Sequence, residues 1–317
     1  MTAAGRPALR AQERILVVKL GALGDVVLAA GPFAAIRRHH PHAHIVLLTG
    51  AAYADFLRPS GWFDEIWTDE RPPLWCVNRW LALRRRLRSG GFDRVYDLQT
   101  SDRSGWYFRL MGPGPRPEWS GIVRGCSHPH ANARRDFMHT VERQVEQLAL
   151  AGIDDVPPAD FAWVAADVAR FVLPGRYALL VPGGAAHRPA KRWPAAGYAA
   201  LARHLAAKGV TAVVLGARDE ARLAAAIRAD CPDARDLTGQ TTLADIAVLA
   251  RGAAAAVGND TGPMHLIAAA GCPSVVLFSA ASDPALTAPR GPAVRVLRRD
   301  RLADLPVAEA AAALSLR

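Results

Sequence analysis

Cysteine is scarce in this sequence, and long apolar runs are missing. The 317 residues include four cysteines, Cys76, Cys126, Cys231 and Cys272. They form no C-x-x-C pair and no cysteine–histidine cluster at zinc spacing. This spacing argues against a disulfide framework and a structural zinc site, and it indicates a reducing compartment. No segment offers the roughly 18 uninterrupted apolar residues of a membrane span, and the first residues lack an apolar stretch of signal-peptide length. We therefore expect a cytoplasmic protein that can associate peripherally with the inner face of the cytoplasmic membrane.

Familiar phosphate-binding patterns are also missing. No D-x-D pair occurs in the chain, which argues against a diphosphate bridged by a metal ion on such a pair. The phosphate loop G-x-x-x-x-G-K-[ST] is absent, and the first glycine-rich turn has Leu23 where the dinucleotide fingerprint requires its second glycine. Any phosphate group must then be neutralised by cationic side chains and backbone amides.

Acidic residues are fewer than basic ones. The chain has 39 Lys and Arg against 29 Asp and Glu, a formal net charge of +10. Arginine makes up most of the excess, and its planar fork of donors suits phosphate recognition. Two interpretations follow: a specific anionic partner, or merely a basic surface on a soluble protein.

The pattern that is present is a repeated alternation of apolar runs, glycine-rich turns and helical stretches. It predicts an α/β fold of two Rossmann-like domains, whose parallel sheets face a central cleft. We expect the domains to comprise residues 1–165 and 166–317, with the linker near 154–176. The main predicted strands are 14–18, 44–50, 65–70, 94–100, 177–184, 211–216, 253–258 and 274–278.

The first polar turn, Lys19 to Asp25, follows the first predicted strand. Glycines at 21 and 24 allow close backbone approach, and Asp25 falls at the start of a helix. Asp25 could simply cap that helix. At the carboxyl end of a strand, where open α/β sheets bind ligands, it is also well placed to act as a general base.

Two further turns occur in the second half of the chain. Gly183 and Gly184 offer accessible backbone N–H groups, and a basic cluster follows them (Arg188, Lys191 and Arg192). This combination fits a diphosphate, although a solvated basic loop would look the same. Asp219 or Glu220, after the next strand, could bond ribose hydroxyls or cap a helix.

The last turn lies in the segment GNDTGPMHL. Asp260 and Thr261 can cap the following helix, Gly262 permits close approach, and His265 falls in the first helical turn. Free amides at a helix N-terminus favour an anion, so we expect this turn to bind phosphate oxygens.

An arginine-rich segment, PPLWCVNRWLALRRRLRSGG at residues 72–91, interleaves tryptophan with basic residues. It could lie on an anionic membrane surface or bind a phosphorylated lipid acceptor, with Arg84 and Arg85 in contact with it. A solvated arginine-rich helix is the alternative.

Taken in order, KLGALGD, PGG…KRWP, LGARDE, LTGQTTL and GNDTGPMHLIAAAG resemble the ADP-heptose:lipopolysaccharide heptosyltransferases, glycosyltransferase family 9. The similarity extends from about Arg14 to Arg290. It implies a GT-B fold, a site between the two domains, and inverting transfer without a metal ion or other cofactor. The ADP-sugar is then a co-substrate, and the acceptor is an anionic lipid-linked oligosaccharide.

The resemblance also assigns residues. Asp25 corresponds to the base that takes the proton of the acceptor hydroxyl, with Lys19 expected on the acceptor side. The donor phosphates and sugar would be bound by a larger set, comprising Gly183, Gly184, Lys191, Arg192, Asp260, Thr261, Gly262 and His265. Glu220 or Asp219 would bind the ribose. The chain departs from the family at Gly184-Ala185-Ala186, where some members carry a pair of hydroxyl residues, which leaves the donor sugar open.

Other functions remain alternatives at this stage. A sugar-nucleotide epimerase would share the fold, and a non-catalytic sugar-nucleotide-binding protein would share the donor site. Nucleic-acid binding is not expected, because the chain has no recognisable reading motif or aromatic platform.

Overall fold

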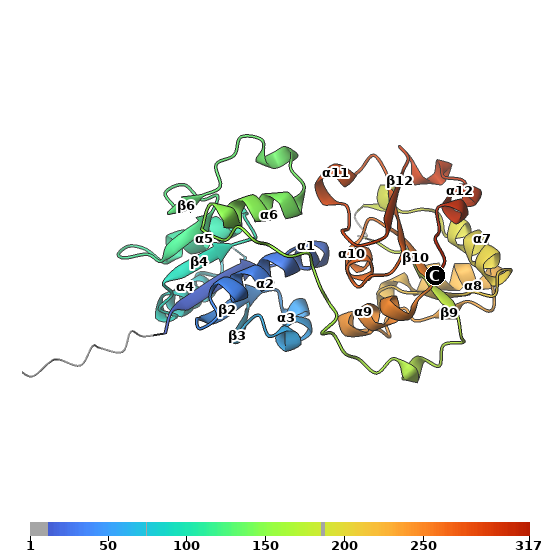
Figure 1. The fold of residues 1–317 in the computed structure, drawn as a ribbon, viewed down its shortest axis with the longest axis horizontal. Coiled ribbons are helices and arrows are strands. Elements are labelled where there is room, and N and C mark those ends of the chain that lie inside the picture. Colours follow the sequence, from blue (N-terminus) through green and yellow to red (C-terminus); the bar gives the residue numbers. More distant parts are fainter. Residues whose placement is uncertain (1–11, 74, 185–187) are drawn as a thin grey trace, which may run out of the picture.

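The computed structural model describes residues 12–73, 75–184 and 188–317. Two α/β halves lie side by side and are joined by a long linker (Figure 1). Each half contains one parallel six-stranded sheet with helices on its faces. The predicted α/β architecture with two Rossmann-like parallel sheets is therefore confirmed.

The N-terminal sheet has the strand order β3-β2-β1-β4-β5-β6. Its strands are β1 Arg14–Lys19, β2 His44–Thr49, β3 Glu65–Thr68, β4 Arg94–Asp97, β5 Glu118–Gly121 and β6 His128–Pro129. The helices are α1 Leu23–Leu28, α2 Ala30–His39, α3 Ala51–Leu57, α4 Val77–Ser89, α5 Asp102–Leu110 and α6 Thr140–Ala149. In β1, Ile15 to Val18 are fully buried, as expected for a central parallel strand covered on both faces.

The C-terminal sheet has the order β12-β11-β10-β7-β8-β9. Its strands are β7 Tyr177–Val181, β8 Thr211–Val214, β9 Arg235–Asp236, β10 Ala255–Asn259, β11 Ser274–Phe278 and β12 Val294–Arg298. The helices are α7 Ala195–Ala206, α8 Ala221–Asp230, α9 Leu243–Gly252, α10 Gly262–Ala269, α11 Pro284–Thr287 and α12 Val307–Ala312. Short 3₁₀ turns include η2 Arg135–Phe137, η4 Pro189–Lys191 and η5 Arg218–Glu220.

Most predicted strands are present, but several end earlier than the sequence suggests. The strand expected over residues 94–100 ends at Asp97, because its side chain accepts hydrogen bonds from the N–H groups of Gln99 and Thr100 and closes a turn. The short strands β5, β6 and β9 and the outer strand β12 were not predicted.

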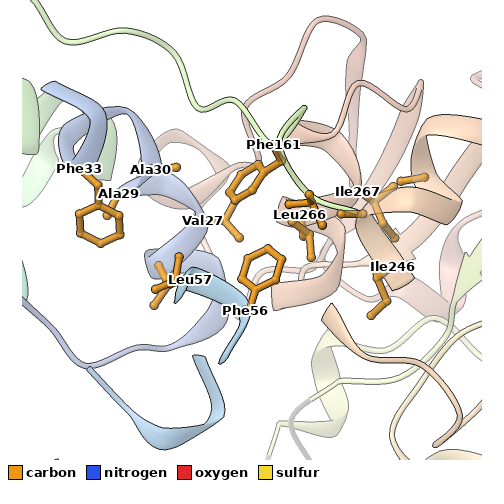
Figure 2. Packing of buried hydrophobic residues seen from close by; sticks show 14 of the residues in the cluster. Val27, Ala29, Ala30, Phe33, Phe56, Leu57, Phe161, Ile246, Leu266 and Ile267 are labelled. Atoms are coloured by element: carbon orange, nitrogen blue, oxygen red, sulfur yellow. The ribbon is translucent and has the colours of Figure 1, made fainter. Parts of the chain in front are cut away.

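The two halves pack against each other through a continuous apolar contact (Figure 2). Val27 of α1 and Phe56 of α3 lie opposite Leu266 of α10. Phe161 of the linker stacks on Phe56, with ring centroids 5.8 Å apart. Arg251, in the last turn of α9, donates hydrogen bonds to the carbonyls of Phe161, Ala162 and Val164. The linker is therefore held between the halves, against α3 of one and α9 of the other.

None of the helices in the described part of the chain combines the length and the apolar composition that a membrane crossing requires.

Candidate active site

The turns that follow β1 and β10 meet where the two halves face each other. α1 begins directly after the first turn and α10 after the last, and the two helices lie opposite one another (Figure 1). A Cβ atom on Gly24 would come within 2.8 Å of the His265 ring, and one on Gly262 within 2.7 Å of Leu23. Glycine at both positions thus permits a close approach that brings Asp25 to the last turn.

Asp25 occupies the first turn of α1, and its carboxylate accepts a hydrogen bond from the Ala22 N–H at 3.2 Å. It is the third residue of α1 and bonds to the N–H of the N-cap residue Ala22, so it supports the start of the helix without being the N-cap that one interpretation of the sequence proposed. It also lines a cavity of about 130 Å³ at the carboxyl end of the N-terminal sheet. The two roles are compatible, because a carboxylate has more acceptor positions than one hydrogen bond uses.

Lys19, at the end of β1, lines the same cavity and is 3% exposed. Its ammonium donates to the Leu98 carbonyl at 3.0 Å. Burial lowers the pKa of Lys19, while the nearby carboxylates of Asp25 and Asp97 act in the opposite direction. Burial raises the pKa of Asp97 to about 6. The charge of Lys19 therefore interacts with two carboxylates, one of which, Asp25, lines the cavity with it.

The donor turns surround a second cavity of about 530 Å³ in the C-terminal half. Arg188, Thr241 and Ile246 line it together with most of the predicted donor residues. These predicted residues are Gly183, Gly184, Lys191, Glu220, Asp260, Thr261 and Gly262. A cavity of this size accommodates a ligand of nucleotide dimensions. Ala185 and Ala186, where the chain departs from the family pattern, lie outside the described residues.

Buried Asn259, the last residue of β10, joins its own turn to the glycine turn and to the start of α7. Its amide N–H₂ donates to the carbonyls of Pro182 and Gly183, and its amide oxygen accepts from the Trp193 N–H and the Tyr198 hydroxyl. This network fixes the backbone of the glycine turn relative to α10 and α7. The sequence analysis did not identify Asn259, although its place in the GND segment at a strand end was a usable signal.

Glu220 holds the glycine turn from the other side. Its carboxylate accepts from the Gly184 N–H at 2.7 Å and from the Ala217 N–H at 2.8 Å. A Cβ atom on Gly183 would lie 2.0 Å from the Glu220 carboxylate, so a larger residue there would displace Glu220 from the glycine turn. Glu220 lines the donor cavity, whereas Asp219 does not, and the geometry favours Glu220 of the two candidates for the ribose.

Lys191 and Asp260 form an ion pair of 2.6 Å at the edge of the donor cavity, with side chains 15% and 8% exposed. A lysine ammonium retains further donors when one is engaged, so it can still reach a bound phosphate. Arg192 does not line the donor cavity, and its guanidinium donates a hydrogen bond to the Gly184 carbonyl of the glycine turn. Thr261 is the N-cap residue of α10 and Gly262 its first residue, so both have backbone N–H groups at the start of the helix. Pro263 follows them and has no backbone N–H group.

His265 lies between the two halves, 5% exposed, with its ring against Gly24. Burial lowers its pKa to about 4, and the nearby Asp260 and Asp25 offset only part of that effect. The imidazole is therefore neutral near pH 7. Its Nδ1 atom has no hydrogen-bond partner among the described residues.

The structure does not bring Arg84 and Arg85 to the Asp25 cavity. Both are on α4, where Arg84 donates to the Gly112 carbonyl at 3.1 Å and Arg85 is exposed. The sequence analysis instead missed two arginines that do line this cavity, Arg135 of η2 and Arg143 of α6. No local pattern marks them, because they reach the site only through the packing of α6 against the first sheet.

A larger cavity of about 680 Å³ lies at the opposite end of the C-terminal sheet. Its lining includes Thr211 and Arg235, the first residues of β8 and β9, and none of the predicted site residues. We take the donor cavity as the functional one because it lies at the carboxyl ends of the strands. Within the described ranges, no three His, Cys, Asp or Glu residues are grouped so that they could hold a metal ion.

Two Rossmann-like halves, with a nucleotide-sized cavity lined by Arg188 and Lys191 on one and the carboxylate of Asp25 on the other, define a glycosyltransferase of the GT-B type. The model of glycosyltransferase family 9 (heptosyltransferase) matches residues 80–310, and the chain belongs to this family. The resemblance predicted from the sequence motifs is confirmed, as is the GT-B fold.

Among curated relatives, lipopolysaccharide heptosyltransferase 2 of Salmonella typhimurium is 38% identical over 313 residues, covering 90% of this chain and 88% of the relative. The Escherichia coli protein of the same name is 27% identical over 310 residues, with the same coverage. The solved structure of E. coli ADP-heptose LPS heptosyltransferase II superposes with a TM-score of 0.77 at 25% identity, covering 95% of this chain and 97% of that one.

Proposed function

We propose that this enzyme transfers a heptose from an ADP-linked donor to a hydroxyl of a lipopolysaccharide core acceptor, with inversion and without a metal ion. The family and the names of the relatives support the donor and acceptor classes. The single observation that carries the chemistry is the close contact of Gly24 with His265, which brings Asp25 to the turn at Asp260–Gly262.

Asp25 acts as the general base in this proposal. Its carboxylate takes the proton of the acceptor hydroxyl as the hydroxyl oxygen attacks the anomeric carbon of the donor. The bond between that carbon and the diphosphate oxygen breaks on the opposite face, and its electron pair leaves with ADP. The configuration at the anomeric carbon is therefore inverted.

Cationic groups and amides stabilise the departing ADP. Lys191 and Arg188 line the donor cavity, and the N–H groups of Thr261 and Gly262 point outward from the start of α10. Preorganised donors of this kind act where charge develops in the transition state. Glu220 accepts hydrogen bonds from the ribose hydroxyls while it holds the glycine turn. His265, neutral and in contact with Gly24, faces the sugar between the two halves.

The donor assignment is tested by calorimetric titration of the purified protein with ADP, UDP and GDP in the presence of a chelator. We expect selective binding of ADP that resists the chelator and weakens about tenfold or more in Lys191→Ala, because a charge-assisted contact is lost. Lys208→Ala, which alters an exposed lysine after α7, is the matched control. Preference for UDP or GDP would overturn the donor assignment, and dependence on a metal ion would overturn the metal-free mechanism.

We also propose that the enzyme binds the inner face of the cytoplasmic membrane through the α4 surface, defined as exposed Trp75, Val77, Leu81, Arg85 and Arg88. Trp75, Val77 and Leu81 are 82%, 61% and 49% exposed. Val77, Leu81, Arg85 and Arg88 are spaced so that they share one helix face. An apolar and cationic face suits anionic lipid headgroups.

Co-sedimentation with lipid vesicles tests this surface. Vesicles containing anionic lipid should retain the protein at low salt, and purely zwitterionic vesicles should not. The double variant Leu81→Glu, Arg85→Glu should lose this binding, whereas Arg222→Glu on α8 of the other half should lose much less. Equal retention of both variants would refute the assignment of the α4 surface.

A further inference from the structure

A polar contact joins the two halves at the first turn of α6, apart from the apolar one. Nε2 of His139, the N-cap residue of α6, lies 2.9 Å from the carbonyl oxygen of Ala288, the C-cap residue of α11. The Thr140 hydroxyl donates a hydrogen bond to the Leu286 carbonyl at 3.3 Å. His139 and Thr140 are 6% and 4% exposed. Two buried side chains of the N-terminal half thus bind backbone carbonyls of the C-terminal half.

The chemistry of these atoms fixes the direction of the His139 bond. A carbonyl oxygen can only accept a hydrogen bond, so Nε2 of His139 carries a proton and donates it. Nδ1 of the same ring accepts from the Val141 N–H at 3.2 Å, which is the capping bond of α6. α11 has four residues, so its last carbonyls lack partners within the helix and need donors from elsewhere. One imidazole ring therefore caps α6 with one nitrogen and binds the other half of the molecule with the second.

This contact differs in kind from the apolar contact between the halves. The burial of apolar side chains such as Phe56 and Leu266 is not directional, so it does not by itself select one orientation of the halves. Hydrogen bonds, in contrast, weaken steeply when their angle departs from linear. In the view of Figure 1, α6 and α11 lie above α1 and α10, whereas α3 and α9 lie below them. The polar and the apolar contact thus lie on opposite sides of the two helices that bring Asp25 to the donor turn.

The same turn of α6 reaches the cavity beside Asp25. Arg143 donates to the Thr140 hydroxyl at 2.8 Å, and both residues line that cavity. The Thr140 hydroxyl therefore connects the acceptor-side cavity to the backbone of the other half. An ion pair of 2.5 Å between Glu142 and Arg290 also crosses between the halves, but its side chains are 48% and 54% exposed. Exposed pairs of this kind contribute little, so the bonds to the two carbonyls carry the contact.

We propose that His139 and Thr140 are positioning residues, whose bonds to the Ala288 and Leu286 carbonyls hold Asp25 at the correct distance from the donor on the other half. The proposal rests on the function proposed above. The two side chains act through the relative orientation of the halves, and small displacements of reacting groups are costly to the rate. The value of kcat therefore depends on these bonds. The affinity for ADP does not, because the C-terminal half provides the whole donor cavity.

Two substitutions of His139 separate the bond between the halves from the helix cap. His139→Asn keeps an acceptor near the Nδ1 position and a good N-cap residue, but its side chain is too short to reach Ala288. It should lower kcat for heptose transfer about 10- to 100-fold and change the Kd for ADP by less than about twofold. His139→Gln can place an N–H group near the Nε2 position and should recover most of the lost kcat. His42→Asn, the same change at an exposed position, is the matched control and should leave kcat unchanged.

Thr140 provides an independent pair of variants. Thr140→Val keeps the shape of the side chain and removes its hydroxyl, so kcat at saturating acceptor should fall about tenfold. Thr140→Ser keeps the hydroxyl and should stay within about twofold of the wild type. Loss of activity in both variants would mean that the methyl group matters and the hydroxyl bond does not.

Hydrogen exchange of backbone amides gives a readout that does not depend on activity. In His139→Asn, the amides of residues 284–290 should exchange faster than in the wild type, whereas those of β10 should be unchanged. The proposal is wrong if His139→Asn keeps the wild-type kcat, if His139→Gln recovers none of the loss, or if exchange in residues 284–290 does not change. If the wild type itself transfers no heptose, the proposed function fails instead, and the exchange measurement still tests the contact between the halves.

Discussion

At the scale of single residues, Asp25 links helix geometry to chemistry. It accepts a hydrogen bond from the N–H of Ala22, the N-cap residue of α1, and lines the acceptor-side cavity at the same time. We predict that Asp25→Asn, which keeps the size of the side chain, lowers kcat by about 100- to 10,000-fold, the range expected for loss of a general base. ADP affinity should stay within about twofold when measured by calorimetry. Near-normal turnover of Asp25→Asn would remove it from the base role.

Asn259 is the second residue on which the site depends. It is fully buried and bonds to the Pro182 and Gly183 carbonyls and to Trp193 and Tyr198. Asn259→Ala should lower the free energy of unfolding by about 1–3 kcal/mol, because several buried polar groups lose their partner. It should also weaken ADP binding, since the glycine turn is no longer fixed. Urea unfolding of this variant and of Asn78→Ala, an exposed position on α4, gives the comparison; equal stability would contradict the network.

How far single residues could be predicted depended on whether a local pattern marked them. Asp25, Lys191 and Asp260 lie in turns that interrupt apolar strands, and they were found there. Arg135 and Arg143 lie far from those turns in the sequence and reach the cavity through tertiary packing, so no pattern indicated them. Arg84 and Arg85 were placed with the acceptor because tryptophans alternate with arginines in that segment, and the sequence could not show which face of α4 they occupy.

At the scale of elements, the contact between α1 and α10 carries the catalytic geometry. A Cβ atom on Gly24 would lie 2.8 Å from the His265 ring. We predict that Gly24→Ala pushes the two helices apart and lowers kcat/KM for transfer about 100-fold, because small displacements of reacting groups are costly. ADP binding, which the C-terminal half provides, should change by less than about threefold.

Gly105→Ala on α5 is the control for this element. A Cβ atom at position 105 would have no neighbouring atom closer than 3.7 Å, so the Gly105→Ala enzyme should be as active as the wild type. If Gly24→Ala were as active as this control, the close packing of α1 on α10 would not be required for catalysis.

The order of strands and turns was predictable because each turn follows an apolar run at a glycine or a polar residue. The residues at which strands end were harder to predict. The strand predicted over 94–100 ends at Asp97, because the Asp97 side chain accepts hydrogen bonds from the N–H groups of Gln99 and Thr100 and so forms a turn. β5, β6 and β9 were missed because they are too short to show a hydrophobic period, with two to four residues each.

At the scale of the whole molecule, His265 makes stability depend on pH. Burial lowers its pKa from 6.5 to about 4 in the folded protein. Between those values the unfolded chain binds a proton that the folded protein excludes, so the free energy of unfolding falls as the pH falls. At pH 5 the loss attributable to His265 should be about 2 kcal/mol, from 1.36 kcal/mol per pH unit.

Urea unfolding of the wild type and of His265→Asn at pH 7.5 and pH 5 measures this contribution. The wild type should lose more stability than the variant over that interval. The same loss in both proteins would mean that His265 titrates at its ordinary pKa, and that it is less buried between the halves than described.

The central claim is that the two halves form one metal-free site, in which the base on the first half acts on a donor bound to the second. The most direct measurement is transfer of heptose from ADP-heptose to a heptose-deficient lipopolysaccharide core, followed by mass spectrometry, with a chelator present. We predict one added heptose with the wild type, addition slowed by about 100-fold or more with Asp25→Asn, and unchanged ADP binding in that variant. Transfer that requires an added metal ion, or that proceeds normally with Asp25→Asn, would contradict the account.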